Sequence, residues 1–358
     1  MNALPDFPWD ALEPYAATAR SHPDGIVNLS VGTPVDPTPR VIQDALAAAA
    51  DAPGYPLTAG SPALREAIVA WFARRFGATL AADSVLPVIG TKELVAWLPT
   101  LLGSRHVGFP ELAYPTYDVG ARIAAATSRV VEATVAVGPQ PLDLLWVNSP
   151  ANPTGRVLPA EHLRKVVEWA RGRGTLVASD ECYADIFYGD AAPVSILSPE
   201  VCGADHTGLL AVHSLSKRSN LAGYRAGFIA GDATIVAKLL EVRKHAGMIV
   251  PAPVQAAMVT ALGDDSHVKE QVERYAARRT ALLVALTAAG FDVEDTGAGL
   301  YLWATRDESC WDTVGWLAER GVLVAPGEFY GAAGSRHVRI ALTETDERIA
   351  AACARLAS

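Results

Sequence analysis

The chain has 358 residues, with 30 lysines and arginines against 39 aspartates and glutamates, which gives a formal net charge of −9. Half of the residues are hydrophobic, so the chain has enough apolar surface to fold into about two domains and is not disordered. The acidic balance argues against broad nucleic-acid binding, because such binding needs cations that neutralise phosphates. It favours small polar metabolites as partners.

The four cysteines, Cys182, Cys202, Cys310 and Cys353, are widely spaced, and no pair forms a CxxC motif. They therefore indicate neither a metal site nor a disulfide framework. The first residues lack the basic and apolar stretches of a signal peptide, and no apolar run reaches the ~18 residues that span a bilayer. We expect a reduced, soluble, cytoplasmic protein with no metal and no membrane partner.

The predicted elements begin after a proline-rich arm of about 60 residues. Helices and short β-rich runs alternate from about residue 60 to 250, which predicts an α/β domain with a largely parallel sheet. The expected helices are Ser61–Phe76, Thr91–Leu102, Pro159–Arg171 and Thr234–His245. The expected strands are Val85–Ile89, His106–Phe109, Ser128–Val137, Leu144–Asn148, Thr175–Ser179, Leu209–His213 and Ala226–Ala230.

The pattern changes after Pro251, where a smaller α+β domain is expected. Its predicted helices and strands are Gln255–Leu262, Val268–Ala289, Phe291–Glu294, Gly299–Thr305, Trp311–Arg320, Gly321–Val324 and His337–Leu342. We expect three parts: an arm at 1–40 that packs with the small domain, a large domain at 41–250, and the small domain at 251–358. The chemistry of such sheets lies in loops beyond the carboxyl ends of the strands.

Two basic motifs lie next to predicted strands, one after Leu209–His213 and one at the start of Ala226–Ala230. HSLSKR at 213–218 puts Lys217 at the sheet edge, where it is either a solvated lysine or a nucleophile with a lowered pKa. Arg218 and Arg225 would favour the neutral amine, because like charge disfavours the ammonium. GYRAG at 223–227 presents Arg225 between glycines, either as an ordinary loop arginine or as a fork for phosphate.

Two further motifs carry an amide and a carboxylate. SPANPTG at 149–155 holds Asn152 between prolines, either as a rigid side-chain donor or within a simple turn cluster. ASDECY at 178–183 ends another strand with Asp180. This carboxylate either caps a following helix or keeps the ring nitrogen of a cofactor protonated.

Taken in order and with their spacing, these four motifs closely resemble those of the fold-type I, pyridoxal 5'-phosphate (PLP)-dependent aminotransferases of class I and II. The resemblance extends from Leu29 to Leu342. It implies a large domain with a mixed, mostly parallel sheet and a smaller α+β domain. It also implies a homodimer that uses PLP to exchange an amino group between amino acids and 2-oxo acids.

The same resemblance implies the catalytic roles. Lys217 would form the internal aldimine and then move a proton between the substrate Cα and the cofactor. Asp180 would pair with the ring nitrogen and keep the ring an electron sink, while Asn152 and Tyr183 would bind its 3′-oxygen. The other implied cofactor-binding residues are Thr91, Ser214, Ser216 and Arg225 around the phosphate, Lys92 beside them, Tyr114 stacked on the ring, and Tyr55 reaching across the dimer.

The implied substrate-binding residues are Gly32, Lys92, Asn152 and Arg339. Arg339 would hold the α-carboxylate, whereas Lys92 either meets a distal carboxylate or faces solvent. Overall the chain is most similar to the actinobacterial N-succinyldiaminopimelate aminotransferases of lysine biosynthesis. This implies that glutamate and 2-oxoglutarate exchange the amino group with N-succinyl-LL-2,6-diaminopimelate.

Several alternatives stay open at this point. The enzyme could be an aspartate, aromatic (kynurenine) or alanine aminotransferase, or a β-lyase acting on cysteine conjugates. A PLP-binding regulator is disfavoured, because such proteins carry an added basic DNA-binding domain and this chain is acidic. In the loop at 326–331, Tyr330 replaces a residue that is usually small in the family.

Overall fold

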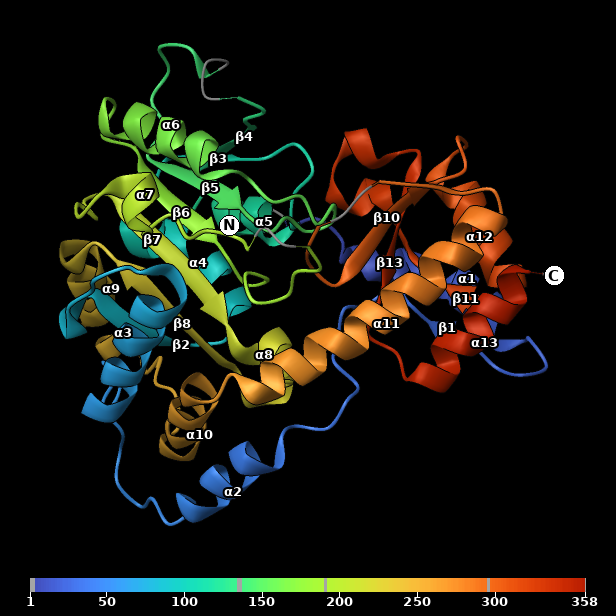
Figure 1. Cartoon of the computed structure of the whole chain (residues 1–358). Coiled ribbons are helices and arrows are strands. Elements are labelled where there is room, and N and C mark those ends of the chain that lie inside the picture. The colour runs from blue at the N-terminus through green and yellow to red at the C-terminus, as the bar shows by residue number, and fades with distance from the viewer. Residues whose placement is uncertain (1–3, 134–136, 190–191, 295–296, 358) are drawn as a thin grey trace.

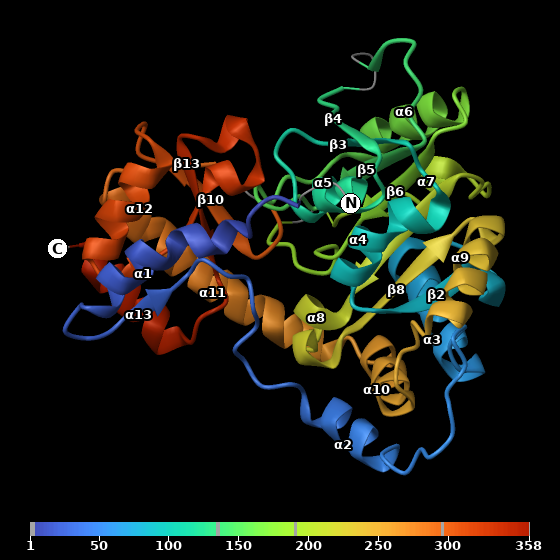
Figure 2. The same cartoon turned by 180° about the vertical axis from the view of Figure 1, so that it is seen from behind.

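A computed structural model describes residues 4–133, 137–189, 192–294 and 297–357. The chain forms two lobes, the larger built around a seven-stranded sheet and the smaller around a four-stranded sheet (Figure 1). Helix α11 (Ser266–Ala288) runs from the edge of the larger lobe into the smaller one, and the view from behind shows the same arrangement (Figure 2). No helix among the described residues is long and apolar enough to cross a membrane.

The seven-stranded sheet has the order β2-β8-β7-β6-β5-β3-β4. Strands β3 to β7 pair in parallel, and β8 runs antiparallel between β2 and β7. The predicted mixed, mostly parallel sheet is thereby confirmed. The strands are β2 (Val85–Ile89), β3 (His106–Phe109), β4 (Thr127–Val130), β5 (Leu144–Asn148), β6 (Leu176–Asp180), β7 (Leu209–Ser214) and β8 (Ala226–Gly231).

One predicted strand is too long. We expected Ser128–Val137, but β4 ends at Val130, and residues 134–136 of that range lie outside the described residues. The reason is the length of the neighbouring strand, because β4 lies at the sheet edge and pairs only with β3, which has four residues. Apolar residues beyond Val130 therefore have no strand against which to continue the ladder.

Helices cover both faces of this sheet, which explains why the residues of its inner strands β5, β6 and β7 are almost all buried. Successive side chains of β5 alternate between the two layers: Leu145 and Val147 face one apolar cluster, whereas Leu144 and Trp146 face the other. The helices of this lobe are α2 (Arg40–Ala48), α3 (Pro62–Phe76), α4 (Thr91–Leu102), α5 (Thr116–Ile123), α6 (Ala160–Arg171), α7 (Pro199–Cys202), α8 (Leu215–Arg218), α9 (Ala233–Ala246) and α10 (Ala252–Gly263).

Helix α3 shows how local sequence sets an element. The hydroxyl of Ser61 accepts a hydrogen bond from the backbone N–H of Leu64, and Pro62 occupies the first turn, where its missing N–H costs nothing. Gly77 ends the helix in the left-handed conformation. Between these two signals, the side chains of Ile68 and Phe72 are buried in the core.

The smaller lobe is an antiparallel sheet of order β12-β13-β10-β9, covered by helices. The N-terminal arm packs on it, because β1 (Val27–Asn28) pairs in parallel with β11 (Val322–Leu323) and α1 (Glu13–Arg20) contacts α12 (Cys310–Glu319). The other elements are β9 (Asp292–Val293), β10 (Tyr301–Thr305), β12 (Ala325–Pro326), β13 (His337–Ala341) and α13 (Asp346–Leu356).

The expected division into three parts, at 1–40, 41–250 and 251–358, stays a proposal. Helix α10 follows the proposed boundary, but its residues Ala257, Met258 and Ala261 are buried in the core of the larger lobe, against α2 and α3. We therefore propose that the small domain begins after Gly263 rather than after residue 250.

Candidate active site

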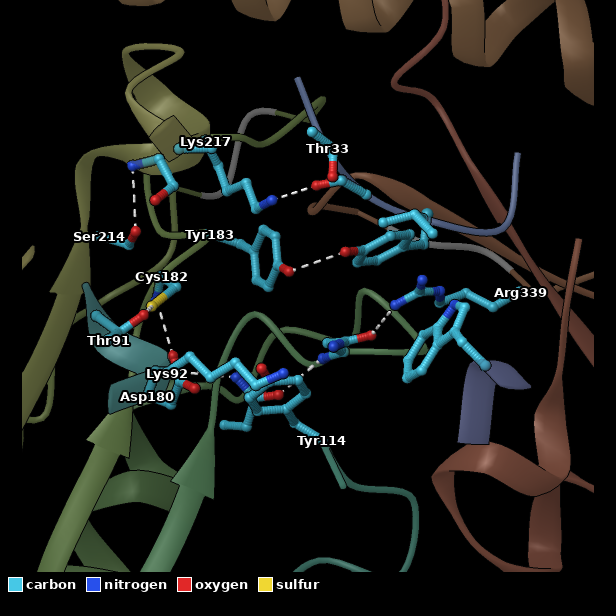
Figure 3. A pocket seen from close by; sticks show the side chains of 18 of the residues that line it. Thr33, Thr91, Lys92, Tyr114, Asp180, Cys182, Tyr183, Ser214, Lys217 and Arg339 are labelled. Carbon is cyan, nitrogen blue, oxygen red and sulfur yellow. Dashed lines mark hydrogen bonds between the residues drawn. The ribbon is translucent and has the colours of Figure 1, made fainter. Parts of the chain in front are cut away.

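A pocket of about 550 Å³ opens where the carboxyl ends of β5, β6 and β7 meet the arm and the smaller lobe (Figure 3). This is the edge of a parallel sheet at which ligands bind. The structure brings nearly all of the predicted site residues together there. They are Gly32, Thr91, Lys92, Tyr114, Asn152, Asp180, Tyr183, Ser214, Ser216, Lys217, Arg225 and Arg339.

Tyr55 is the predicted site residue that does not line this pocket. Its side chain is fully exposed to solvent in the single chain, at 100% relative exposure. A large aromatic side chain held entirely in water gains nothing from the fold of its own chain. The predicted reach of Tyr55 into the neighbouring subunit of a dimer therefore stays a proposal.

Lys217 enters the pocket from α8, the short helix that follows β7. Its ammonium donates a hydrogen bond to the backbone oxygen of Gly32, in the arm (Figure 3). Burial lowers the pKa of Lys217, and the positive charges of Arg339 and Arg225 lower it further. A larger fraction of this lysine is therefore in the neutral form, which is the nucleophilic form of an amine.

Arg218, which we also expected to act on Lys217, lies in a different environment. Its side chain is buried, and its Nε donates to Asp185 at 2.6 Å while its NH2 lies 3.4 Å from Asp265. These carboxylates compensate its charge. Arg218 instead fixes α8 to the start of α11, because Asp265 is the N-cap residue of that helix.

Asp180 ends β6 and is buried at the floor of the pocket. Its Oδ2 accepts a hydrogen bond from the Tyr117 hydroxyl at 2.8 Å, and its Oδ1 accepts one from the backbone N–H of Cys182 at 3.2 Å. Burial raises the pKa of Asp180, although these two hydrogen bonds oppose the rise. A buried carboxylate in such a position is stabilised by a cation placed next to it.

Asn152 is placed by the residue that ends β5. Asn148 is buried, and its side-chain oxygen accepts from the backbone N–H of Asn152 at 2.7 Å. Its amide donates to the backbone oxygen of Asp180 at 2.9 Å. One side chain therefore fixes the loop of Asn152 against the strand that carries Asp180. The sequence shows no signal for this role beyond the position of Asn148 at the end of a strand.

An anion cradle lies around the start of α4. Arg225 has a left-handed backbone with φ of 56°, and its guanidinium crosses Gly90, where an added Cβ would lie 2.3 Å from the guanidinium NH2. Gly90 is therefore needed for this close approach. Thr91 begins α4, whose free N–H groups favour an anion, and Ser214 and Ser216 line the same pocket.

Arg339 lies on β13 of the smaller lobe and is 3% exposed. Its guanidinium donates to the side-chain oxygen of Asn152 at 2.9 Å and to the backbone oxygen of Ser30 at 2.7 Å, and it stacks 3.8 Å from the centre of the Tyr301 ring. Its Nε has no acceptor, and no carboxylate pairs with it, among the described residues. A buried cation without a counter-ion is suited to binding an anionic group.

Tyr301 was not predicted as a site residue from the sequence, although the strand that contains it was. Its hydroxyl lies 3.1 Å from that of Tyr183, and an added Cβ on Gly32 would lie 2.1 Å from the same hydroxyl. Burial alone would raise the pKa of Tyr301, but the charges of Arg339 and Lys217 bring it below its ordinary value. Tyr301 therefore contacts Tyr183 by its hydroxyl and packs closely against Gly32 of the arm.

Other pocket residues that the sequence did not single out as site residues are Phe7, Trp9, Val31, Thr33, Asn148, Cys182 and Ala222. Tyr117, whose hydroxyl donates to Asp180, was likewise assigned no role from the sequence. The sequence contains only a weak signal that these residues belong to the site, because single aromatic and small residues are common in any protein core. Burial raises the pKa of Tyr114 to about 12, so its hydroxyl stays protonated, and its ring meets that of Tyr117 edge-on.

These groups fit PLP on their chemistry. The cationic cradle at Arg225 suits a phosphate, the buried Asp180 suits a protonated ring nitrogen, and the amine of Lys217, whose pKa is lowered by burial, suits an aldehyde. The fold and this set of side chains are those of the fold-type I PLP-dependent enzymes.

Comparison with known proteins supports this assignment to the PLP-dependent enzymes. Residues 24–356 match the family model "Aminotransferase class I and II". The chain is 66% identical to a probable aminotransferase of Mycobacterium tuberculosis, over 99% of this chain and 85% of the relative. It is 60% identical to 4-dedimethylamino-4-oxo-anhydrotetracycline transaminase OxyQ of Streptomyces rimosus, over 99% and 100%. A solved structure of a probable N-succinyldiaminopimelate aminotransferase from Thermus thermophilus superposes with a TM-score of 0.89 at 29% identity, over 98% and 99%.

The chain therefore belongs to the class I and II aminotransferases, which use PLP to act on amino acids and 2-oxo acids and are typically dimers. The prediction of family, fold, cofactor and reaction class from the sequence is confirmed. The finer similarity to N-succinyldiaminopimelate aminotransferases is not confirmed, because the relatives at 60% identity or more carry other names.

Proposed function

We propose that this aminotransferase exchanges an amino group between glutamate and 2-oxoglutarate on one side and N-succinyl-LL-2,6-diaminopimelate on the other. The observation that carries the proposal is the buried Arg339, which has no carboxylate partner among the described residues and lies in the same pocket as Lys217 and Lys92. Two separate cations suit substrates that carry an α-carboxylate and a second carboxylate. The solved structure of a probable N-succinyldiaminopimelate aminotransferase with TM-score 0.89 supports the second substrate.

The roles of the chain's own residues follow from their positions. Arg339 binds the α-carboxylate and thereby orients the Cα–H bond, and the amine of Lys217 removes and returns that proton. PLP, when bound, supplies the conjugated ring that takes up the electron pair of the substrate Cα. Asp180 would hold a proton on the ring nitrogen of bound PLP, and Asn152 and Tyr183 would hold its 3′-oxygen. Thr91, Ser214, Ser216 and Arg225 would bind its phosphate, with Lys92 beside them, and Tyr114 would contact its ring.

A second candidate has a specific observation in its favour. The relative at 60% identity is named for a tetracycline intermediate with a 4-oxo group. The pocket of this chain has aromatic walls, formed by Phe7, Trp9, Tyr114 and Tyr301, which suit a flat, fused-ring ketone as amino acceptor. In that case glutamate would remain the donor, and the acceptor would be a polycyclic ketone.

A half-reaction screen of the purified holoenzyme tests both candidates. Each donor is mixed with the enzyme without an acceptor, and the change in cofactor absorbance gives the rate. The donors are glutamate, N-succinyl-LL-2,6-diaminopimelate, aspartate, alanine, kynurenine, phenylalanine and an aminated anhydrotetracycline. We expect glutamate and N-succinyl-LL-2,6-diaminopimelate to react fastest. A fast reaction of the tetracycline amine and none of the succinylated amine would select the second candidate. Pyruvate released from a cysteine conjugate without an acceptor would indicate a β-lyase.

Replacing Arg339 by alanine should weaken the binding of every amino acid substrate. Truncating one partner of a buried, charged hydrogen-bonded pair costs about 2–5 kcal/mol, so kcat/KM should fall by about 30-fold or more for glutamate and alanine alike. The matched variant Arg339→Lys keeps the charge but loses the two-pronged fork, and it should recover only part of the loss. An unchanged kcat/KM with retained cofactor absorbance would show that the α-carboxylate binds elsewhere.

Replacing Lys92 by alanine should lower activity selectively for substrates that carry a second carboxylate. A hydrogen bond to a charged group contributes about 1.5 kcal/mol or more, so kcat/KM for glutamate should fall about 10-fold, while that for alanine stays within about 2-fold. The glutamate preference of the wild type should also shrink at high ionic strength, because the Lys92 side chain is exposed. Equal losses for both donors would assign Lys92 to the cofactor instead.

We further propose that Tyr55 completes the site of the partner subunit in a homodimer and binds the cofactor there. The exposed Tyr55 and Leu57 lie in one loop, which supports an interface at this place. We also propose a cytoplasmic location, consistent with the four free cysteines of the described residues.

A further inference from the structure

Two tyrosine hydroxyls meet inside the active-site pocket, one from each lobe. Tyr183 follows β6 in the larger lobe, and Tyr301 begins β10 in the smaller lobe. Their hydroxyl oxygens lie 3.1 Å apart, and a dashed line from Tyr183 marks this contact in Figure 3. Both side chains are buried, at 8% and 4% exposure. The contact is therefore a hydrogen bond shielded from water, where such bonds are electrostatically stronger than in solvent.

The surroundings of the two hydroxyls differ, which gives this hydrogen bond a direction. The guanidinium carbon of Arg339 lies 3.8 Å from the centre of the Tyr301 ring. Burial alone would raise the pKa of Tyr301, but the charges of Arg339 and Lys217 bring it below its ordinary value, whereas burial raises the pKa of Tyr183. Because the more acidic hydroxyl of a hydrogen-bonded pair gives its proton to the other, Tyr301 is the donor and the Tyr183 oxygen is the acceptor.

The charged and titratable groups that face the Tyr301 hydroxyl come from several elements. Tyr183 is the group that is hydrogen-bonded to it, whereas the hydroxyl of Tyr330 is buried and has no partner among the described residues. The full set is Arg339 on β13, Lys217 on α8, Cys182 and Tyr183 after β6, Tyr114 before α5, Tyr275 on α11 and Tyr330 after β12.

We propose that Tyr301 is a positioning residue that acts on the cofactor through Tyr183: its hydroxyl donates to the Tyr183 oxygen and leaves the Tyr183 proton for the 3′-oxygen of PLP. A tyrosine hydroxyl has one proton, so a donor at its oxygen directs that proton elsewhere, and consecutive hydrogen bonds strengthen one another. The inference rests on the proposed function, in which Tyr183 holds the 3′-oxygen. It assigns to the smaller lobe a part in holding the cofactor, in addition to Arg339.

Titration of the absorbance of bound PLP with pH tests the proposal. A donor to the 3′-oxygen stabilises its negative charge after the nitrogen that joins Lys217 to PLP has lost its proton, so each donor lowers the midpoint of the titration. Tyr301→Phe keeps the ring beside Arg339 and removes only the hydroxyl, and its midpoint should be about 0.5 pH higher than that of the wild type. Tyr183→Phe removes the direct donor, and its midpoint should be about 1 pH higher or more.

Two further variants make the test specific. Tyr330→Phe is the matched control, because it makes the same change at a buried hydroxyl whose ring lies 4.9 Å from the same Arg339 guanidinium but which is not bonded to Tyr183. Its midpoint should equal that of the wild type to within about 0.1 pH. The double variant with both Tyr183→Phe and Tyr301→Phe should have the midpoint of Tyr183→Phe alone, because Tyr301 acts through Tyr183.

The outcomes separate this inference from the proposed function. A midpoint of Tyr183→Phe equal to that of the wild type would refute the role proposed for Tyr183. If Tyr183→Phe does raise the midpoint, an unchanged midpoint in Tyr301→Phe would refute the inference alone. A lowered midpoint in Tyr301→Phe would refute it as well, since the Tyr301 oxygen would then compete for the Tyr183 proton. Additive increases in the double variant would show that Tyr301 does not act through Tyr183.

Discussion

Replacement of Lys217 by alanine is expected to reduce amino-group transfer by on the order of 10⁴-fold or more. The amine is needed twice, first as the group that holds the cofactor covalently and then as the base at the substrate Cα, and a positioned base alone contributes about 10²–10⁴-fold. Mass spectrometry after borohydride reduction should find PLP attached to the wild-type peptide that contains Lys217 and to no peptide of the variant.

The matched control for this variant is Arg218→Lys, one position further along the chain. Arg218 lies outside the pocket and holds α8 to Asp185 and Asp265, so its conservative replacement should leave covalent PLP attachment intact. Attachment of PLP to a lysine other than Lys217 in the wild type would contradict the assignment. A normal rate in Lys217→Ala would do so as well.

The lowered pKa of Lys217 adds a pH dependence to this result. Burial disfavours the ammonium, so the neutral amine is reached at a lower pH than for an ordinary lysine. Capture of PLP by the cofactor-free protein should therefore accelerate as the pH rises, with a midpoint below the ordinary pKa of lysine. A midpoint at the ordinary value would show that burial does not activate this amine.

Replacement of Asp180 by asparagine is expected to give the second large effect. The change keeps the shape of the side chain but removes the negative charge that stabilises a proton on the ring nitrogen. Removing one electrostatic stabiliser from a buried site costs about 10²–10³-fold in rate, and cofactor retention should weaken in parallel. Stopped-flow half-reactions give the rate, and dialysis against buffer without PLP gives the retention.

Tyr117→Phe provides the comparison for Asp180. It removes one hydrogen bond from a neutral hydroxyl to Oδ2 and leaves the carboxylate charge in place, so it should cost only about 10-fold. A rate for Asp180→Asn as high as that for Tyr117→Phe would mean that the charge of Asp180 does not act on the ring nitrogen.

Much of the larger lobe could be predicted from the sequence because its signals are local. Strands such as Val85–Ile89 and Leu144–Asn148 were predicted with the bounds that the structure has, since they are apolar runs between turn residues. The strand expected at Ser128–Val137 was too long, because its end depends on the length of β3 and not on its own residues. The length of a neighbouring strand cannot be predicted from the residues of the strand itself.

The motifs at Asn152, Asp180, Lys217 and Arg225 could also be recognised in the sequence. Each of them combines a chemical group with turn residues next to a strand. Asn152, Asp180 and Lys217 meet in one pocket because β5, β6 and β7 pair in parallel and their carboxyl ends share one edge. Arg225 joins them because it precedes β8, which is antiparallel to β7 and starts at the same edge. For these residues, knowledge of the fold class is nearly enough to locate the site.

By itself, therefore, the amino-acid sequence determined most of the strands, the reaction family and most of the predicted residues that line the pocket. Only the tertiary structure decided that Tyr301 fills the space beside Gly32, that Tyr117 supports Asp180, and that Phe7 and Trp9 of the arm line the pocket. The physical reason is that these contacts join segments far apart in the chain. Their geometry is set by the packing of two lobes and an arm, and an isolated tyrosine or tryptophan has no sequence neighbour that reveals its partner.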